Sequence, residues 1–181
     1  YRSLPIHKAC EYGARLEVIR LLLDSHADKK SILVKDINGW LPIHHACRKN
    51  APVEVNQLLL DSDVDKKKIF EKDRDGHLPI HRACYGGATV EVIRLLLDSD
   101  VGKKTSLEKG NRGQLPIYIA CESNAPIAVI QLLLQVSVCD RIEQLRSSMD
   151  ELINDIVEDD SGEEKTKKVQ EICKRLPVDD E

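Results

Sequence analysis

The chain has 181 residues, enough for one compact domain or one elongated array of small units. Hydrophobic residues make up 41% and charged residues 32%, a balance that indicates a folded rather than a disordered protein. Residues 1–139 carry 20 Lys and Arg against 17 Asp and Glu, whereas residues 140–181 carry 7 against 14. Neither part is basic enough to favour nucleic acid as a partner, and no apolar run reaches the roughly 18 residues that would span a membrane.

The start of the chain and its cysteines give two further expectations. The chain opens with YRSLPIH, without an initiator methionine or a signal-peptide pattern, so we expect it to be a segment of something longer. Six cysteines are too few for the disulfide framework of a small secreted protein. Free thiols suit a reducing compartment, and we therefore expect the cytosol or the nucleus.

Three phrases recur with a spacing of 37 residues. The first is LPIHKAC at 4–10, LPIHHAC at 41–47, LPIHRAC at 78–84 and LPIYIAC at 115–121. The second begins as RLEVIRLLLD at Arg15 and returns at Pro52, Thr89 and Pro126. The third is DINGW at 36–40, DRDGH at 73–77 and GNRGQ at 110–114. A fixed period of about 20–50 residues indicates a solenoid, in which each unit stacks on its neighbours.

Each unit predicts a turn followed by a helix. Asp36 and Gly39 stand at the first and fourth positions of a type I turn. Pro42 then suits the first position of a helix, because its φ is already helical and its missing N–H is not needed there. Helical spacing places the next apolar residues on one face: Ile43, Ala46 and Cys47.

A second helix is predicted over residues 52–62, after KNAP ends the first. Its buried stripe is predicted to be Val55, Leu58 and Leu59. Asn56 stands where the other units have isoleucine, so its amide needs a hydrogen-bond partner or a wet edge. The connector that follows carries lysines, such as Lys66 to Lys68, which we expect to form a solvated edge; a basic ridge for phosphate or acidic lipid is the alternative.

The three phrases together resemble the ankyrin repeat, over about residues 1–139. The resemblance implies an all-α solenoid of helix-turn-helix units with short hairpin turns. Two departures stand out: the period is 37 residues against about 33 for the family, and leucine replaces the family's threonine at positions 4, 41, 78 and 115. The residues that carry the structural motif are Pro5, His7, Cys10, Pro42, His44, Cys47, Pro79, His81, Cys84, Pro116 and Cys121.

The His and Cys of the first phrase raise the question of metal or catalytic chemistry. A structural zinc needs four converging ligands at about 2.0–2.3 Å, whereas the next such pair would lie on a helix about 8–10 Å away. Tyr118 replaces the histidine in the last unit. A catalytic cysteine would need an exposed, activated thiol, and an active site is not normally built four times. We therefore favour a structural role and expect no metal, no cofactor and no enzymatic activity.

Positions that vary between units are candidates for partner contacts. The resemblance implies that turns and first helices line a concave recognition face. The candidate binding residues on that face are Trp40, His45, Arg48, Lys49, Arg74, His77, Arg82 and Tyr85. Trp, Tyr and Arg are the types enriched in interface hot spots, and the basic residues favour an acidic segment in the partner. For Trp40 the alternative is packing against the neighbouring turn.

The repeat stops after Val138, and residues 140–181 predict an acidic helical cap. Apolar residues from Ile142 to Val157 follow helical spacing, and Ser161 with Glu164 forms a capping-box pattern that opens a second helix. These helices either cap the array, form a seam for a dimer or a neighbouring domain, or contact a basic surface. No such cap precedes the first unit, so we expect further repeats upstream.

The sequence thus predicts a non-enzymatic module that binds another protein through its concave face. The alternative is a structural segment of a larger protein or assembly, held by its N-terminal end or its C-terminal helices. A third hypothesis is an array whose cysteines respond to metal or to oxidation.

Overall fold

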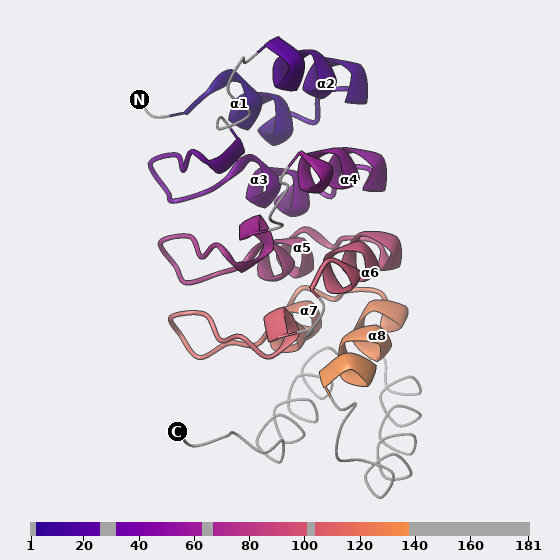
Figure 1. Cartoon of the computed structure of the whole chain (residues 1–181). Helices are drawn as coiled ribbons and strands as arrows, with labels where there is room; N and C mark the ends of the chain where they lie inside the picture. The colour runs from indigo at the N-terminus through magenta and orange to yellow at the C-terminus, as the bar shows by residue number, and fades with distance from the viewer. Residues whose placement is uncertain (1–2, 26–31, 63–66, 101–103, 138–181) are drawn as a thin grey trace, which may run out of the picture.

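The computed structural model describes residues 3–25, 32–62, 67–100 and 104–137, and the predicted C-terminal cap lies outside these ranges. Within them the structure contains helices and turns but no strand, as the sequence predicts. The units form a straight stack of helical pairs, with a hairpin turn projecting from each junction to the same side (Figure 1). None of the helices in these ranges is both long and apolar enough to cross a membrane.

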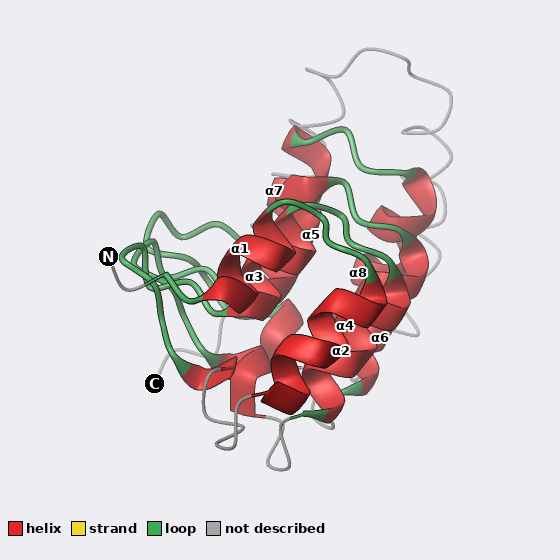
Figure 2. Ribbon diagram, turned by 90° about the horizontal axis from the view of Figure 1, so that it is seen from above, coloured by secondary structure: helices red, strands yellow, loops and turns green. Residues whose placement is uncertain are grey.

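Two layers of helices build the stack (Figure 2). The inner helices are α1 (Pro5–Glu11), α3 (Pro42–Arg48), α5 (Pro79–Gly86) and α7 (Pro116–Glu122). The outer helices are α2 (Leu16–Ser25), α4 (Val53–Asp61), α6 (Val90–Asp98) and α8 (Ile127–Ser137). Each inner helix contacts the next inner helix, and each outer helix contacts the next outer helix. Neighbouring units therefore bury one continuous core between them, as expected for a solenoid.

The motif histidine joins each hairpin to its inner helix. In the first unit the backbone N–H of Leu4 donates to His7 Nδ1 at 3.1 Å, and the same bond recurs at His44 and His81. Nδ1 must therefore be the acceptor, which leaves the proton on Nε2. From there His7 donates to Val34 O at 2.9 Å. One imidazole thus links a helix start to the connector that follows the same unit.

The core is built from equivalent positions of successive units. The four motif cysteines are all buried free thiols: Cys10, Cys47, Cys84 and Cys121. On α4, Val55 and Leu59 are buried as predicted, but Leu58 is only partly buried and Leu60 takes its place. The prediction missed Leu60 because an outer helix packs against both its inner helix and its outer neighbours, which widens its apolar face.

Asn56 finds its hydrogen bonds inside the core. It is fully buried, and its Nδ2 donates to Ala51 O at 3.0 Å and to Pro52 O at 3.2 Å. Its Oδ1 accepts from Cys47 Sγ at 3.4 Å. A buried amide is stable only when its polar atoms are paired in this way.

The connectors fold into short 3-10 turns, η2 (Lys67–Phe70) and η3 (Lys104–Ser106). The expectation of a solvated lysine edge is wrong for Lys68, which is only 1% exposed. Its Nζ donates to Leu59 O, near the end of α4, at 2.6 Å. A cation satisfies a helix-end carbonyl and gains from the helix dipole, which explains why this lysine turns inward.

Candidate functional site

The hairpins of the second and third units are each closed by a leading aspartate. Asp36 Oδ1 accepts the backbone N–H groups of Asn38 and Trp40 at 2.8 and 2.9 Å, and Asp36 O accepts from Gly39 N at 3.0 Å. Gly39 has φ +75°, a left-handed conformation that glycine adopts without strain. A Cβ there would also come within 3.0 Å of Arg74 N in the next hairpin. The predicted turn is present, and it fixes where Trp40 stands.

Backbone bonds tie the hairpins to one another. Arg74 N donates to Asn38 O at 3.2 Å, and Asn111 N donates to Asp75 O at 3.0 Å. The Asn111 side chain adds a bond from Nδ2 to Arg74 O at 2.9 Å. The hairpins therefore hold a fixed register and extend the face of the inner helices as one surface.

In the second unit the aspartate pairs with a histidine. Asp36 Oδ2 and His45 Nε2 are 3.0 Å apart, and both side chains are nearly buried. Burial alone would raise the pKa of Asp36, but the N–H groups of Trp40 and Asn38 and the His45 ring outweigh it and lower that pKa. Burial lowers the pKa of His45 against the pull of Asp36. The Trp40 ring covers this pair, with its centroid 4.8 Å from that of His45.

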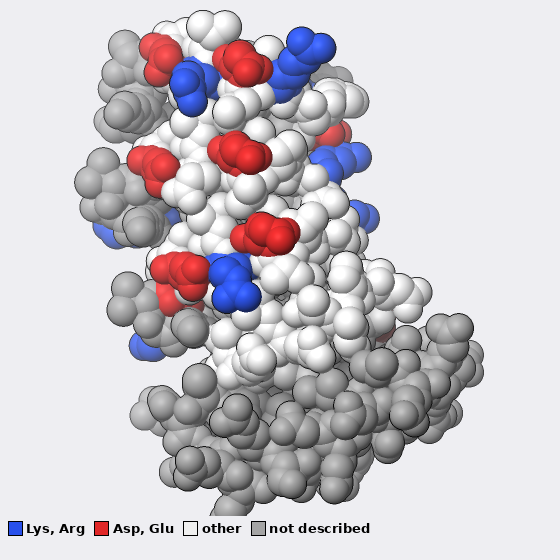
Figure 3. Space-filling model, turned by 90° about the vertical axis from the view of Figure 1, so that its right-hand side faces the viewer, with Lys and Arg blue, Asp and Glu red and all other residues white. Residues whose placement is uncertain are grey.

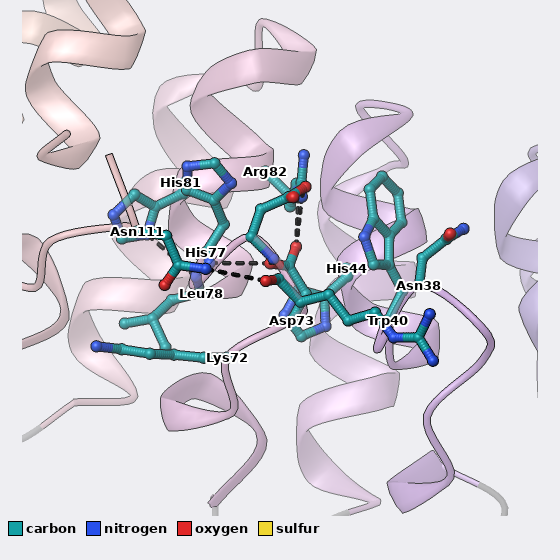
Figure 4. Close-up of polar contacts among 12 residues, drawn as sticks. Asn38, Trp40, His44, Lys72, Asp73, His77, Leu78, His81, Arg82 and Asn111 are labelled. Atoms are coloured by element: carbon teal, nitrogen blue, oxygen red, sulfur yellow. Dashed lines mark hydrogen bonds and ion pairs between the residues drawn. The ribbon is translucent and has the colours of Figure 1, made fainter. Parts of the chain in front are cut away.

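In the third unit the corresponding pair is Asp73 and Arg82 (Figure 4). Arg82 Nε donates to Asp73 Oδ2 at 2.7 Å, and Nη2 donates to Asp75 Oδ2 at 2.7 Å. This ion pair with Arg82 lowers the pKa of Asp75. The Arg82 guanidinium carbon also lies 4.4 Å from the centre of the Trp40 ring, within cation–π range. Trp40 therefore stands between His45 of its own unit and Arg82 of the next.

Tyr85 extends this cluster along the inner helices. Arg48 Nη1 donates to Tyr85 O at 3.2 Å, and its guanidinium carbon is 6.0 Å from the Tyr85 ring centre. The His77 ring contacts the same tyrosine edge-on, with centroids 5.6 Å apart. A Cβ on Gly86 would lie 2.5 Å from Arg48 O, so a glycine there lets α3 and α5 approach closely.

The eight candidate binding residues divide by exposure. Three are exposed: Arg48, Lys49 and Arg74. Two are partly buried: Trp40 and Tyr85. The other three are buried at 5–8% exposure: His45, His77 and Arg82. The structure gathers six of the eight into one connected cluster, which leaves out Lys49 and Arg74. We call these six residues, Trp40, His45, Arg48, His77, Arg82 and Tyr85, the central cluster.

The aspartates that anchor this cluster were not among the predicted site residues. Asp36 and Asp73 each stand nine residues before the side chain they pair with. That spacing, present in two units and absent from the fourth, was a signal in the sequence that could have identified them.

Two arrangements bear on metal and thiol chemistry. Asp73, Asp75 and His77 have ligand atoms within 4.8 Å of one another. Arg82 already pairs with both carboxylates, so a cation at this place would have to displace the guanidinium. Burial raises the pKa of the Cys10 thiol to about 12 and raises those of Cys47 and Cys84 as well. Such thiols stay protonated at neutral pH and are poor nucleophiles and metal ligands.

The outer face of the stack differs in charge from the hairpin side. Figure 3 shows Asp and Glu side chains gathering on the face formed by the outer helices. Exposed acidic residues recur at two positions of α2, α4 and α6, whereas α8 has Ala128 and Gln135 there. The six acidic residues are Glu17, Asp24, Glu54, Asp61, Glu91 and Asp98. This excess of negative charge disfavours the approach of an acidic segment to the outer face.

A comparison with protein-family models identifies the same repeat region. A family model described as ankyrin repeats (3 copies) matches residues 2–69 and 55–142. The two matches overlap and together cover the whole array that the structure describes. The search of curated proteins finds no match to this chain.

Proposed function

Because the chain belongs to the ankyrin-repeat family, we propose that it is a non-enzymatic module that binds another protein through the concave face of its array. Arrays of this family are generally protein–protein interaction modules, and no catalytic domain is found in the matched region. The observation that carries the choice of surface is the central cluster. It places one Trp, one Tyr and two Arg side chains in mutual contact across two units.

The cluster suits recognition because it is both held in place and partly open. His45 and Arg82 are buried and paired with aspartates, so they support the Trp40 ring from both sides. Trp40 and Tyr85 keep part of their surface exposed. Aromatic anchors that are rigid before binding lose little conformational entropy when a partner arrives.

The charge around the cluster favours an acidic segment in the partner. Arg82 is already neutralised by Asp73 and Asp75, so it adds no net positive charge to this surface. The cations that face solvent are Arg48, Lys49 and Arg74. Exposed charges of one sign at a rim mainly steer association and set its salt dependence.

The test is an affinity pull-down from the native source with identification of retained proteins, followed by titration of each isolated partner. The variant Trp40→Ala/Arg48→Ala/Tyr85→Ala is compared with a control on the outer face, Arg20→Ala/Arg94→Ala. Both are first checked for folding by circular dichroism. We expect the first variant to lose partners that the wild type and the control retain. If all three proteins bind the same partners with equal affinity, recognition does not use this face.

A structural segment of a larger assembly is the second candidate, favoured by the exposed end of the first unit. Val18 is 44% exposed, whereas the equivalent Val55, Val92 and Val129 are between 1% and 3% exposed. Leu21 on the same helix is 68% exposed. In the other units the preceding unit covers this face. Sedimentation of the isolated chain distinguishes the two candidates, since self-association that Leu21→Lys abolishes would support docking through this end.

A further inference from the structure

The connectors carry one exposed apolar side chain at the same position of three units. Leu33, Phe70 and Leu107 are 37 residues apart and are 49%, 49% and 51% exposed. The residue before each of them is buried in the core, so the backbone of the turn cannot rotate the exposed side chain inward. Scattered exposed apolar residues are ordinary, but one that recurs in successive units forms a row along the stack. We call these three residues the connector row.

Hydrogen bonds hold the connector row in register. The residue that follows it is tied to an inner helix in the first and third connectors, through His7 Nε2 to Val34 O at 2.9 Å and His81 Nε2 to Glu108 O at 3.0 Å. Lys35 Nζ also donates to Lys72 O at 2.8 Å, which links one connector to the next. The row is therefore preformed, and a partner would not have to order it.

The charges beside the row are mainly positive. Besides the buried Lys68, five lysines of the described ranges lie within three residues of a row member in sequence: Lys35, Lys67, Lys72, Lys104 and Lys109. Lys35 and Lys72 pair with Glu71 and Glu108 at 2.7 Å, so the excess positive charge comes from the other three lysines. Figure 2 shows the connector turns at the foot of the hairpins, on the side of the outer helices, and η2 also contacts the inner helix α5. None of the six residues of the central cluster belongs to a connector. The row is thus separate from the central cluster.

The spacing of the row members determines which secondary structure of a partner can match them. Packed helices lie about 8–10 Å apart, so successive row members are separated by about that distance. Two turns of an α-helix rise about 10.8 Å, which places residues seven apart on one side at nearly this interval. In a β-strand the same distance is about three residues, and residues three apart point to opposite faces. A helix can therefore set one residue of the same face beside each row member, whereas a strand cannot match the row residue for residue.

We propose that the connector row binds an amphipathic α-helix of a partner protein that runs along the stack. Its apolar residues recur every seven positions and fit between Leu33, Phe70 and Leu107. Acidic residues flank them and face the bordering lysines. This surface acts independently of the concave face, so one module can hold two partners.

The probe is a synthetic helical peptide of three heptads, with one leucine per heptad at a constant position and glutamates beside it. A control peptide has the same composition with the leucines distributed around the helix. Binding to the full chain is measured by fluorescence anisotropy for wild type, for Phe70→Ser, and for Ile127→Ser, which removes an exposed apolar side chain on α8. Circular dichroism checks the fold of each variant.

We expect the patterned peptide to bind wild type and Ile127→Ser alike, to bind Phe70→Ser at least about tenfold more weakly, and to lose affinity with salt. The control peptide should bind none of them. No binding at millimolar concentration, equal binding of the two peptides, or equal loss in both variants overturns the proposal. Sedimentation shows whether the wild-type chain self-associates through Phe70, and that outcome would assign the row to a second copy of the chain and likewise overturn the partner helix.

Discussion

The second and third units place different side chains on the same backbone frame. In both, an aspartate closes the hairpin and pairs with the side chain nine residues later. In the second unit Asp36 Oδ2 lies 3.0 Å from His45 Nε2, and in the third Asp73 Oδ2 lies 2.7 Å from Arg82 Nε. In the fourth unit glycine and isoleucine hold these two positions, and there is no such pair.

The two units share the contacts that the fold requires and differ in the side chain that pairs with the aspartate. The hairpin bonds of the aspartate are the same in both units, so they belong to the fold. Its partner is free to change, and it decides the charge beside Trp40. Arginine is charged at every accessible pH, whereas a buried histidine changes its charge with small shifts of environment.

The largest expected effect comes from removing the partner of each aspartate. Arg82→Met leaves the Asp73 carboxylate, 7% exposed, without its cation, and we expect a loss of about 3–5 kcal/mol in the free energy of unfolding. His45→Met removes a weaker partner from Asp36, and we expect the free energy of unfolding to fall by about 1–2 kcal/mol. Urea denaturation monitored by circular dichroism measures both.

The double variant Asp73→Asn/Arg82→Met is the control for this comparison. It removes the carboxylate together with the guanidinium, so it should recover part of the stability that Arg82→Met loses. Equal losses in Arg82→Met and His45→Met would show that the two pairs contribute alike, against the distinction drawn between the units.

Low pH is expected to destabilise both units through their buried histidines. Burial lowers the pKa of His44 to about 3 and, together with the nearby His77, lowers that of His81 to about 4. At acid pH the unfolded chain therefore binds protons at these histidines that the folded chain does not bind. The free energy of unfolding has its full value above about pH 6.5 and falls as the pH drops toward 4. For His81 alone we expect a loss of about 3 kcal/mol between these limits.

His45 adds to the loss in the second unit, because its folded-state pKa also lies below the ordinary value. NMR titration of the ring protons, with urea denaturation at each pH, separates the contributions. An unfolding free energy that stays constant from pH 7 to pH 4 would contradict the expected burial of neutral imidazoles.

A smaller effect separates the two units in their outer helices. Asn56 is buried on α4 where α6 has Ile93. Asn56→Ile copies the third unit, and we expect the stability to change by about 1 kcal/mol or less, because the lost hydrogen bonds are offset by apolar burial. Asn56→Ala provides neither the hydrogen bonds of asparagine nor the apolar burial of isoleucine, so it should lower the free energy of unfolding by about 2 kcal/mol. A larger loss for isoleucine than for alanine, measured by thermal unfolding, would show that the second unit cannot accept the side chain of the third.

The repeat itself explains why so much of the fold could be predicted. Pro42, the histidine two residues later and the leucine triplet recur in phase, and each has a local reason for its place. Contacts made by residues that do not recur from unit to unit were harder to predict. Lys68 turns inward because Leu59 O, near the end of α4, accepts a hydrogen bond from its ammonium group. The equivalent positions hold Ser31 and Thr105, so comparison between units gave no signal for this bond. Likewise, Arg82 was predicted to face a partner, but burial depends on Asp73 and Asp75, which only the folded hairpin brings to it.

The smallest expected effect is on the ion pairs that link the connectors. Lys35 pairs with Glu71 and Lys72 pairs with Glu108, each at 2.7 Å and each partly exposed. Surface pairs of this kind contribute about 0.2–1 kcal/mol, so Lys72→Met should lower the unfolding free energy by no more than that. Lys35→Met should cost slightly more, because the Lys35 ammonium also donates to Lys72 O. High salt should remove the contribution of the ion pairs but leave that of the backbone bond, since only the ion pairs are screened. If the two variants respond identically to salt, the bond from Lys35 to the next connector adds nothing, and the register of the connector row must come from the histidines alone.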